Sequence, residues 1–176
     1  TSSDGLVGWG EGGQWGPAEP VATCIEAVLG PRILGRDPRQ PTRIWEENYA
    51  ATRDFGQKGT YIEAISGIDI ALWDILGQSL GAPVHMLLGG AFRDRVTAYA
   101  TGCYYRGDDV LDHRAMIPAL AAEARSYVDA GFTMVKTKVG LLSVEADLER
   151  LAAIREAIGP AIPMMVDANH AYNAYT

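Results

Sequence analysis

The chain has 176 residues, of which 48% are hydrophobic and 21% are charged, a balance typical of a globular protein with a sizeable core. Its net charge of −7 and its lack of any basic cluster argue against nucleic-acid binding. No apolar run is long enough to cross a membrane, and the visible sequence shows no signal peptide. Because Cys24 and Cys103 lie far apart, we expect two reduced thiols in a cytoplasmic protein rather than a disulfide.

The first half of the sequence predicts a mainly helical region. One strand is expected to end near Trp9, and a glycine-rich loop follows it. The spacing of apolar residues predicts helices over about residues 17–29, 41–53 and 60–80. Thr60 and Glu63 have the spacing of a capping box at the start of the third helix. We interpret Asp69 and Asp74 within that helix as structural residues that bind nearby backbone or arginine groups.

The second half predicts alternating strands and helices, the pattern of a parallel α/β sheet or barrel. Strands are expected over residues 95–101, 132–139 and 162–168, and helices over residues 113–130 and 144–158. The apolar stripe of the second helix is assigned to Leu148, Leu151, Ala152 and Ile154. In a βα barrel the chemistry sits at the C-terminal ends of the strands. Polar or reactive residues fall at these ends: Cys103 and Tyr104, Lys136 and Lys138, Asp167 and Asn169.

The second strand carries Lys136 and Lys138 among β-branched residues. Because strand side chains alternate faces, both lysines point one way, while Val135, Thr137 and Val139 point toward a helix layer. The lysine face then looks into an interior, where an ammonium is costly without a negative partner. Adjacent ammonium groups also lower the pKa of such lysines, which favours one of them as a base near neutral pH. An edge strand with solvated lysines is the weaker alternative, because an acid ends the next strand.

That acid is Asp167, which we predict to be a ligand of Mg²⁺, a cation that prefers hard oxygen donors. Asn169 lies on the same face and is expected to hydrogen-bond a substrate. His170 points the other way in a regular strand, so it is a weaker candidate for substrate binding. Tyr104 and Tyr105 follow the first strand of this half, and we expect one to line the substrate pocket and the other to pack.

The pair Lys136-x-Lys138, followed by Val166-Asp167-x-Asn169, resembles the enolase superfamily, and within it the mandelate racemase and muconate lactonizing enzyme branch. Blocks in the first half agree with this resemblance: GWGEG at residues 8–12, AISGIDIALWD at 64–74 and PVHMLLGG at 83–90. The resemblance implies an α/β fold, with a partial α+β capping domain over residues 1–93 and a truncated (β/α) TIM-type barrel over residues 94–176. A complete barrel takes roughly 250 residues, so we expect an internal piece of a longer protein.

The resemblance also implies a reaction, the Mg²⁺-dependent abstraction of the α-proton of a carboxylate substrate through an enediolate. Lys138 would be the base, Lys136 its neighbour in contact with the substrate carboxylate, and Asp167 a metal ligand. Two further acidic ligands and a His–Asp pair would follow residue 176. In the capping domain Trp15 is the better candidate for a cavity wall. Glu11 could face the substrate cavity, and a structural role in its glycine-rich turn is an equal alternative. The intact protein is expected to be a homo-oligomer.

The expected substrate is a small carboxylic acid, and three outcomes stay open. Dehydration of a sugar acid is preferred, because a pocket edge with Tyr104 and Asn169 suits a hydroxylated acid. Racemisation or cycloisomerisation of another α-substituted carboxylic acid is the alternative. A non-catalytic barrel fragment is the alternative of another class, and the presence of both lysines and Asp167 argues against it.

Overall fold

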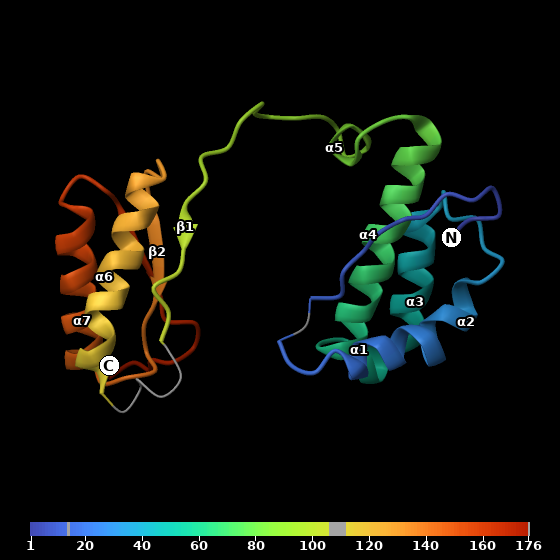
Figure 1. Ribbon diagram of the computed structural model, residues 1–176. Helices are drawn as coiled ribbons and strands as arrows, with labels where there is room; N and C mark the ends of the chain where they lie inside the picture. The colour runs from blue at the N-terminus through green and yellow to red at the C-terminus, as the bar shows by residue number, and fades with distance from the viewer. Residues whose placement is uncertain (14, 106–111, 176) are drawn as a thin grey trace. The chain divides into compact units, whose positions relative to one another are not determined.

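The computed structural model describes residues 1–13, 15–105 and 112–175, which form two compact units, Thr1–Asp94 and Arg95–Thr176 (Figure 1). Within these described residues, no helix has both the length and the apolar character that a membrane span requires. Cys24 lies in the first unit and Cys103 in the second, and both side chains are buried. Burial raises the pKa of the Cys24 thiol.

The first unit is built on helices around one apolar core. Figure 1 shows α3 and α4 side by side, and these two helices contact each other along their length. The elements are α1 (Glu19–Thr23), the π-helix η1 (Cys24–Leu29), α2 (Gly30–Ile33), α3 (Pro41–Gly56), α4 (Thr60–Leu80) and α5 (Val84–Leu87). The buried core consists of Val21, Cys24, Leu29, Ile44, Ala64, Ile65, Ile68 and Leu72.

The first helical stretch differs from the expected helix over residues 17–29. It begins at Glu19, continues to Ile33 and contains the π-helical segment η1 in its middle. Pro31 lacks an N–H, and its ring would clash with the carbonyl of Ala27 in a continuous α-helix. The wider π turn before Pro31 accommodates the ring, which apolar spacing alone does not reveal.

The helix predicted over residues 60–80 is confirmed, but the capping box at its start is wrong. Gly59 is the N-cap residue, with a φ of 69°, and Thr60 is already helical. The amide of Glu63 bonds to the carbonyl of Gly59 at 3.0 Å, and no side chain caps the helix. A capping box needs the threonine itself at the N-cap position, and here the glycine occupies it.

The strand expected to end near Trp9 is also wrong, because none of residues 1–13 is in a strand. The segment is held instead by side chains of α4. The amide of Trp9 donates to Asp74 Oδ2 at 2.9 Å, and Gln78 Nε2 donates to the carbonyl of Val7 at 2.8 Å. Asp74 therefore has the predicted structural role. Burial raises the pKa of Asp69, and a hydrogen bond with the Trp73 side chain lowers it in part.

Glycines allow this N-terminal segment to lie directly on α4. A Cβ atom at Gly8 would lie 2.0 Å from the carbonyl oxygen of Ala71, and one at Gly10 would lie 2.0 Å from that of Gly67. No real Cβ atom tolerates such a distance to a backbone oxygen. Backbone packing in this unit thus explains Gly8 and Gly10 of the GWGEG block.

The second unit has the predicted order of strands and helices. Its elements are β1 (Ala100–Thr101), α6 (His113–Asp129), β2 (Val135–Lys138), α7 (Val144–Ile158) and β3 (Met164–Asp167). The strands form one parallel sheet in the order β1-β2-β3. Side chains cap both helices, because Asp112 accepts from the amide of Arg114 and Ser143 accepts from that of Ala146.

The first strand of this sheet is shorter than the expected residues 95–101. Ala100 pairs with Val135, so residues 95–99 lie opposite residues 130–134 when the register is followed backwards. Those residues are the C-cap of α6, Ala130, and the turn after it, where Gly131 has a φ of 93°. They present no extended strand with which residues 95–99 could form parallel backbone hydrogen bonds. β1 therefore begins only where β2 begins.

Both helices pack on one face of the sheet, and Figure 1 shows α6 and α7 side by side next to β2. Val135 and Thr137 are fully buried toward these helices, as the alternation of strand side chains predicted. Lys136 and Lys138 occupy the other face and keep partial exposure. The core of this unit contains Cys103, Met116, Leu120, Ala124, Val135, Ile154 and Ile158.

Candidate functional site

The lysines of β2 and the acid of β3 form one cluster. Asp167 Oδ2 lies 2.8 Å from Lys136 Nζ and 2.7 Å from Lys138 Nζ. The register explains this meeting, because Lys138 pairs with Asp167 at the C-terminal ends of neighbouring parallel strands. The side chains are only 22% to 29% exposed, so the three charges are partly withdrawn from water yet still reachable. This arrangement agrees with the prediction that the lysine face has a negative partner.

Asn169 completes the cluster by contacting both Lys138 and Asp167. Its Oδ1 accepts a hydrogen bond from Lys138 Nζ at 2.6 Å, and its amide donates to Asp167 Oδ1 at 2.8 Å. Its φ of 52° lies in the left-handed region, which asparagine adopts more readily than most residues. The chain therefore turns directly after β3 and aims the Asn169 side chain back at Lys138.

The charges of this cluster shift the pKa values of its members. Hydrogen bonds from Lys136, then Lys138, then the Asn169 amide hold the pKa of Asp167 well below its usual range. The same carboxylate raises the pKa of Lys136. The expectation that lysine–lysine repulsion lowers the pKa is thus wrong for Lys136, because the shared carboxylate outweighs the neighbouring cation.

The other predicted site residues have different positions. Tyr104 is 44% exposed and close enough to Lys136 to act on its charge, whereas the hydroxyl of Tyr105 turns inward to Asp147. His170 is exposed beside Asn169. Trp15 belongs to the first unit and is 92% exposed.

A hollow of about 300 Å³ adjoins Lys138 at the ends of β2 and β3. Asn169 and His170 border it on the side of β3, and Gly140 and Leu141 border it on the side of β2. The predicted base and two predicted substrate-binding residues thus face one open space. Cys103, at the end of β1, is fully buried and does not reach it.

Two charged residues of α7, Asp147 and Arg150, were not predicted and yet lie under this site. Arg150 is 0% exposed and Asp147 is 2% exposed, and they form an ion pair of 2.6 Å. The expected apolar stripe is wrong in part, since Leu148 is 58% exposed and Ala152 is also exposed. The buried face runs instead through Ala146, Asp147, Arg150, Ile154 and Ile158. The only sequence signal is an Asp and an Arg spaced three residues apart, a spacing more common on solvated helix faces.

The chemistry of the donor set fits part of a magnesium site. Asp167 offers a hard, ionised carboxylate at a strand end, the kind of ligand that Mg²⁺ prefers. Across residues 1–13, 15–105 and 112–175, no three or more His, Cys, Asp or Glu side chains gather as a metal site would require. The described residues therefore offer one candidate ligand, Asp167, and not a complete set.

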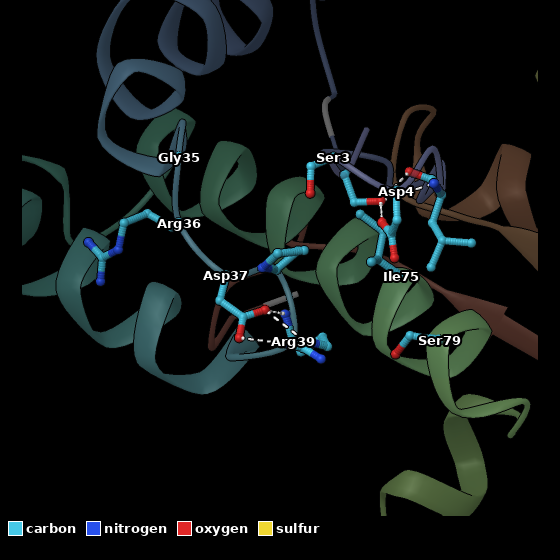
Figure 2. Close-up of a pocket in the computed structure, with 11 residues that line it drawn as sticks. Ser3, Asp4, Gly35, Arg36, Asp37, Arg39, Ile75 and Ser79 are labelled. Atoms are coloured by element: carbon cyan, nitrogen blue, oxygen red, sulfur yellow. Dashed lines mark hydrogen bonds and ion pairs between the residues drawn. The ribbon is translucent and has the colours of Figure 1, made fainter.

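The first unit contains a separate hollow of about 470 Å³ between the N-terminal segment and the loop after α2. Figure 2 shows Asp37 and Arg39 pointing toward each other in it, joined by hydrogen bonds of 3.0 and 3.2 Å. Arg36 is paired with Glu47 at 2.6 Å. Since both arginines are neutralised by neighbouring carboxylates, this hollow offers no unpaired cation for a substrate carboxylate.

Comparison with known families matches both halves of the chain. The mandelate racemase / muconate lactonizing enzyme N-terminal domain matches residues 1–89, and the enolase C-terminal domain-like family matches residues 119–176. The first of these matches covers 89 of the 176 residues, just over half of the chain.

Relatives of known activity share much of the sequence. The D-galactarolactone cycloisomerase of Agrobacterium fabrum is 49% identical over 96% of this chain and 42% of its own length. The arabinonate dehydratase of Saccharolobus solfataricus is 42% identical over 97% of this chain and 44% of its own length. The chain thus spans less than half the length of these relatives.

Solved structures give the same assignment. The 3,6-anhydro-D-galactonate cycloisomerase of Zobellia galactanivorans has a TM-score of 0.86 at 40% identity, covering 98% of this chain and 45% of that one. A racemase of Streptomyces coelicolor A3(2) with bound magnesium has a TM-score of 0.82 at 33% identity, covering 98% and 49%. These matches confirm the α/β fold class and the predicted family. The chain belongs to the mandelate racemase and muconate lactonizing enzyme family of the enolase superfamily.

Proposed function

We propose that the intact protein removes the α-proton of a sugar acid and forms an enediolate. The observation that carries this proposal is the convergence of Lys136, Lys138 and Asp167 at the C-terminal ends of two parallel strands. Strand ends are where βα barrels place their chemistry. Removing a proton next to a carboxylate builds up negative charge, which positive groups at the site stabilise.

The two lysines have different roles in this proposal. Lys136 is the cation that binds the substrate carboxylate, because the raised pKa of its ammonium keeps it charged at neutral pH. Lys138 is the base. A neutral amine has two N–H groups and one lone pair, and Asp167 Oδ2 and Asn169 Oδ1 are placed to accept those two N–H bonds. The lone pair is then left for the α-proton of the substrate.

Asp167 would be one ligand of Mg²⁺, with the other ligands supplied by parts of the intact protein outside this chain. When bound, Mg²⁺ stabilises the negative charge on the substrate carboxylate oxygens. The acidity of Asp167 supports this assignment, because the pKa lowered by its cationic neighbours keeps the carboxylate ionised and ready to coordinate.

Dehydration is the first candidate outcome. The α C–H bond breaks and its proton goes to Lys138 Nζ. The β C–O bond then breaks as its hydroxyl takes up a proton from the resulting Lys138 ammonium, and the hydroxyl leaves as water. The remaining enol becomes a 2-keto-3-deoxy acid. The arabinonate dehydratase at 42% identity supports this outcome. Cycloisomerisation of a sugar-acid lactone is the second candidate, supported by the relative at 49% identity. Both begin with the same proton abstraction.

One experiment tests the proposal and separates the outcomes. The full-length protein with Mg²⁺ is incubated in D₂O with a library of aldonic acids, aldaric acids and their lactones. A separate comparison set contains dipeptides and muconate-like diacids, and proton NMR follows each α-proton. We expect exchange or turnover within this library, with a 2-keto-3-deoxy product for dehydration or a rearranged lactone for cycloisomerisation. Turnover confined to dipeptides or muconate-like diacids would reject the sugar-acid assignment while leaving the family intact.

Three further expectations accompany this function. Tyr104, at the end of β1, and His170, at the edge of the hollow beside Lys138, would contact the substrate. The exposed ring of Trp15 would form part of a cavity wall in the intact protein. A homo-oligomer in the cytoplasm is also expected, and light scattering of the full-length protein would determine its oligomeric state.

A further inference from the structure

A buried polar network lies beneath Lys138, on the helix side of the sheet. Its centre is the ion pair between Arg150 Nη1 and Asp147 Oδ1 at 2.6 Å, with side chains 0% and 3% exposed. Both residues come from the first half of α7. Two charges so fully removed from water are costly unless they gain further hydrogen bonds.

Those further bonds go to the ends of β1 and β2. Arg150 Nη2 donates to the carbonyl of Cys103 at 3.0 Å, and its Nη1 donates to the carbonyl of Lys138 at 3.3 Å. The amide of Gly140 donates to Asp147 Oδ2 at 2.7 Å. One ion pair therefore holds the backbone on both sides of Val139, the residue that follows Lys138.

Tyr105 ties the loop after β2 to the same pair. Its hydroxyl donates to Asp147 at 2.8 Å and accepts from the amide of Leu141 at 3.2 Å. Its ring lies 4.0 Å from the guanidinium carbon of Arg150, a cation–π contact. Tyr105, one of the two tyrosines considered for the pocket, also borders the hollow beside Lys138 and is thus part of the support under the base.

Stability alone is a poor reason for this arrangement. A buried ion pair is often no better for stability than apolar residues of the same volume. Arg150 Nε also has no hydrogen-bond partner among the described residues, which adds a cost. The bonds that are formed concentrate on the strand end that carries Lys138.

We propose that Arg150, Asp147 and Tyr105 are positioning residues that fix the end of β2 and thereby aim the amine of Lys138 at the substrate α-carbon. This inference rests on the proposed function of Lys138 as the base. A misplacement of about 1 Å in a reacting group can lower a rate on the order of 10²-fold. A backbone shift at Lys138 or Gly140 moves the lysine without removing it.

The test compares two arginines of the same helix in the full-length protein. Arg150→Lys keeps the charge but cannot reach Asp147 and two carbonyls at once. The matched control is Arg155→Lys, because Arg155 also bonds to backbone carbonyls, those of Gly159 and Ile162, near the opposite end of β3. Tyr105→Phe is a milder second variant that removes only the hydroxyl. The readouts are α-proton exchange in D₂O, KM, and amide hydrogen exchange at Gly140 and Leu141.

We expect Arg150→Lys and Tyr105→Phe to lower the exchange rate by roughly 10- to 100-fold with KM changed by less than about twofold. The Leu141 amide should exchange faster in both variants, and the Gly140 amide faster in Arg150→Lys. Arg155→Lys should keep the wild-type rate even if its Tm falls. If Arg150→Lys does not fold, Tyr105→Phe decides alone.

Wild-type exchange rates in the Arg150 and Tyr105 variants would overturn the inference, as would an equal loss in Arg155→Lys. Lys138→Met is measured in parallel to separate the two hypotheses. If Lys138→Met retains exchange, the proposed base is wrong. If Lys138→Met loses exchange while the supporting variants do not, only the positioning inference fails.

Discussion

Lys138 Nζ and Asp167 Oδ2 lie 2.7 Å apart although 29 positions separate the two residues in the sequence. They are register partners at the ends of neighbouring parallel strands, so the pairing of β2 and β3 is what brings them together. The predicted base and the predicted metal ligand therefore share one hydrogen bond. Substitution of Lys138 should change the rate of α-proton exchange, whereas substitution of Asp167 should change the affinity for Mg²⁺.

Lys138→Met in the full-length protein should abolish exchange of the substrate α-proton. Methionine fills a similar volume without the amine, so the fold should persist. Loss of a positioned base typically lowers the rate by about 10²–10⁴-fold. Deuterium exchange followed by NMR measures this. Lys136→Met is the companion variant and should mainly raise KM. Exchange at the wild-type rate in Lys138→Met would require a base on another part of the protein.

Asp167→Asn should weaken Mg²⁺ binding by the full-length protein, because it removes the charge of one carboxylate ligand. Isothermal titration calorimetry with MgCl₂ measures the affinity directly and does not depend on activity. Asp129→Asn is the control, since Asp129 is paired with Arg125 on α6 away from the cluster. Equal Mg²⁺ affinity in wild type and Asp167→Asn would remove Asp167 from the ligand set.

Gly10→Ala should destabilise the first unit. The new Cβ would lie 2.0 Å from the carbonyl oxygen of Gly67, so the N-terminal segment must move off α4. Overpacking of this kind costs about 1–3 kcal/mol or more. Gly13→Ala is the matched control, because a Cβ there meets nothing within 4 Å. Thermal unfolding of both variants should show a lower Tm for Gly10→Ala only. An unchanged Tm would mean that the segment does not rest on α4.

Acid stability should depend on Glu149, which bonds to Arg114 at 2.9 Å and to His113 at 2.9 Å. These bonds, Arg114 first, lower its pKa from 4.5 to about 2. Between these pH values the unfolded chain binds a proton that the folded protein does not, so stability falls as the pH falls. Glu149→Gln should flatten this part of the profile, and Arg114→Gln should flatten it in part. Tm measured against pH tests this, and an unchanged slope in Glu149→Gln would contradict it.

The sequence predicted most of this fold because apolar periodicity and strand alternation are local signals. The helix over residues 144–158 has its predicted limits, and Lys136 and Lys138 lie on the predicted face. The sequence also predicted the lysines and Asp167 at the ends of neighbouring parallel strands, whereas their direct ion pairs were not predicted. The roles of these residues stay predictions until the intact protein is tested.

The structural features that the sequence did not predict depend on contacts between residues that lie far apart in the chain. The spacing of Asp147 and Arg150 is typical of a solvated pair on a helix surface. Their burial is explained only by the hydrogen bonds that Arg150 donates to the backbone carbonyls of Cys103 and Lys138. The length of β1 depended on where β2 begins. The pKa of Lys136 depended on one carboxylate shared with its neighbour. None of these appears in a local pattern of apolar and polar residues.

The hydrogen-bonded register of β2 and β3 affects how such a protein could change its preference for substrate acids. The register is set through the pairs from Val135 with Met164 to Lys138 with Asp167, before either loop begins. Replacing exposed residues after the strands, such as His170, would reshape the hollow without altering the spacing of Lys138 and Asp167. A one-residue insertion inside β2 would instead turn the lysines toward the helices. Under the proposed function, loop exchange is therefore the route by which new acids could be accepted while the proposed proton removal by Lys138 is retained.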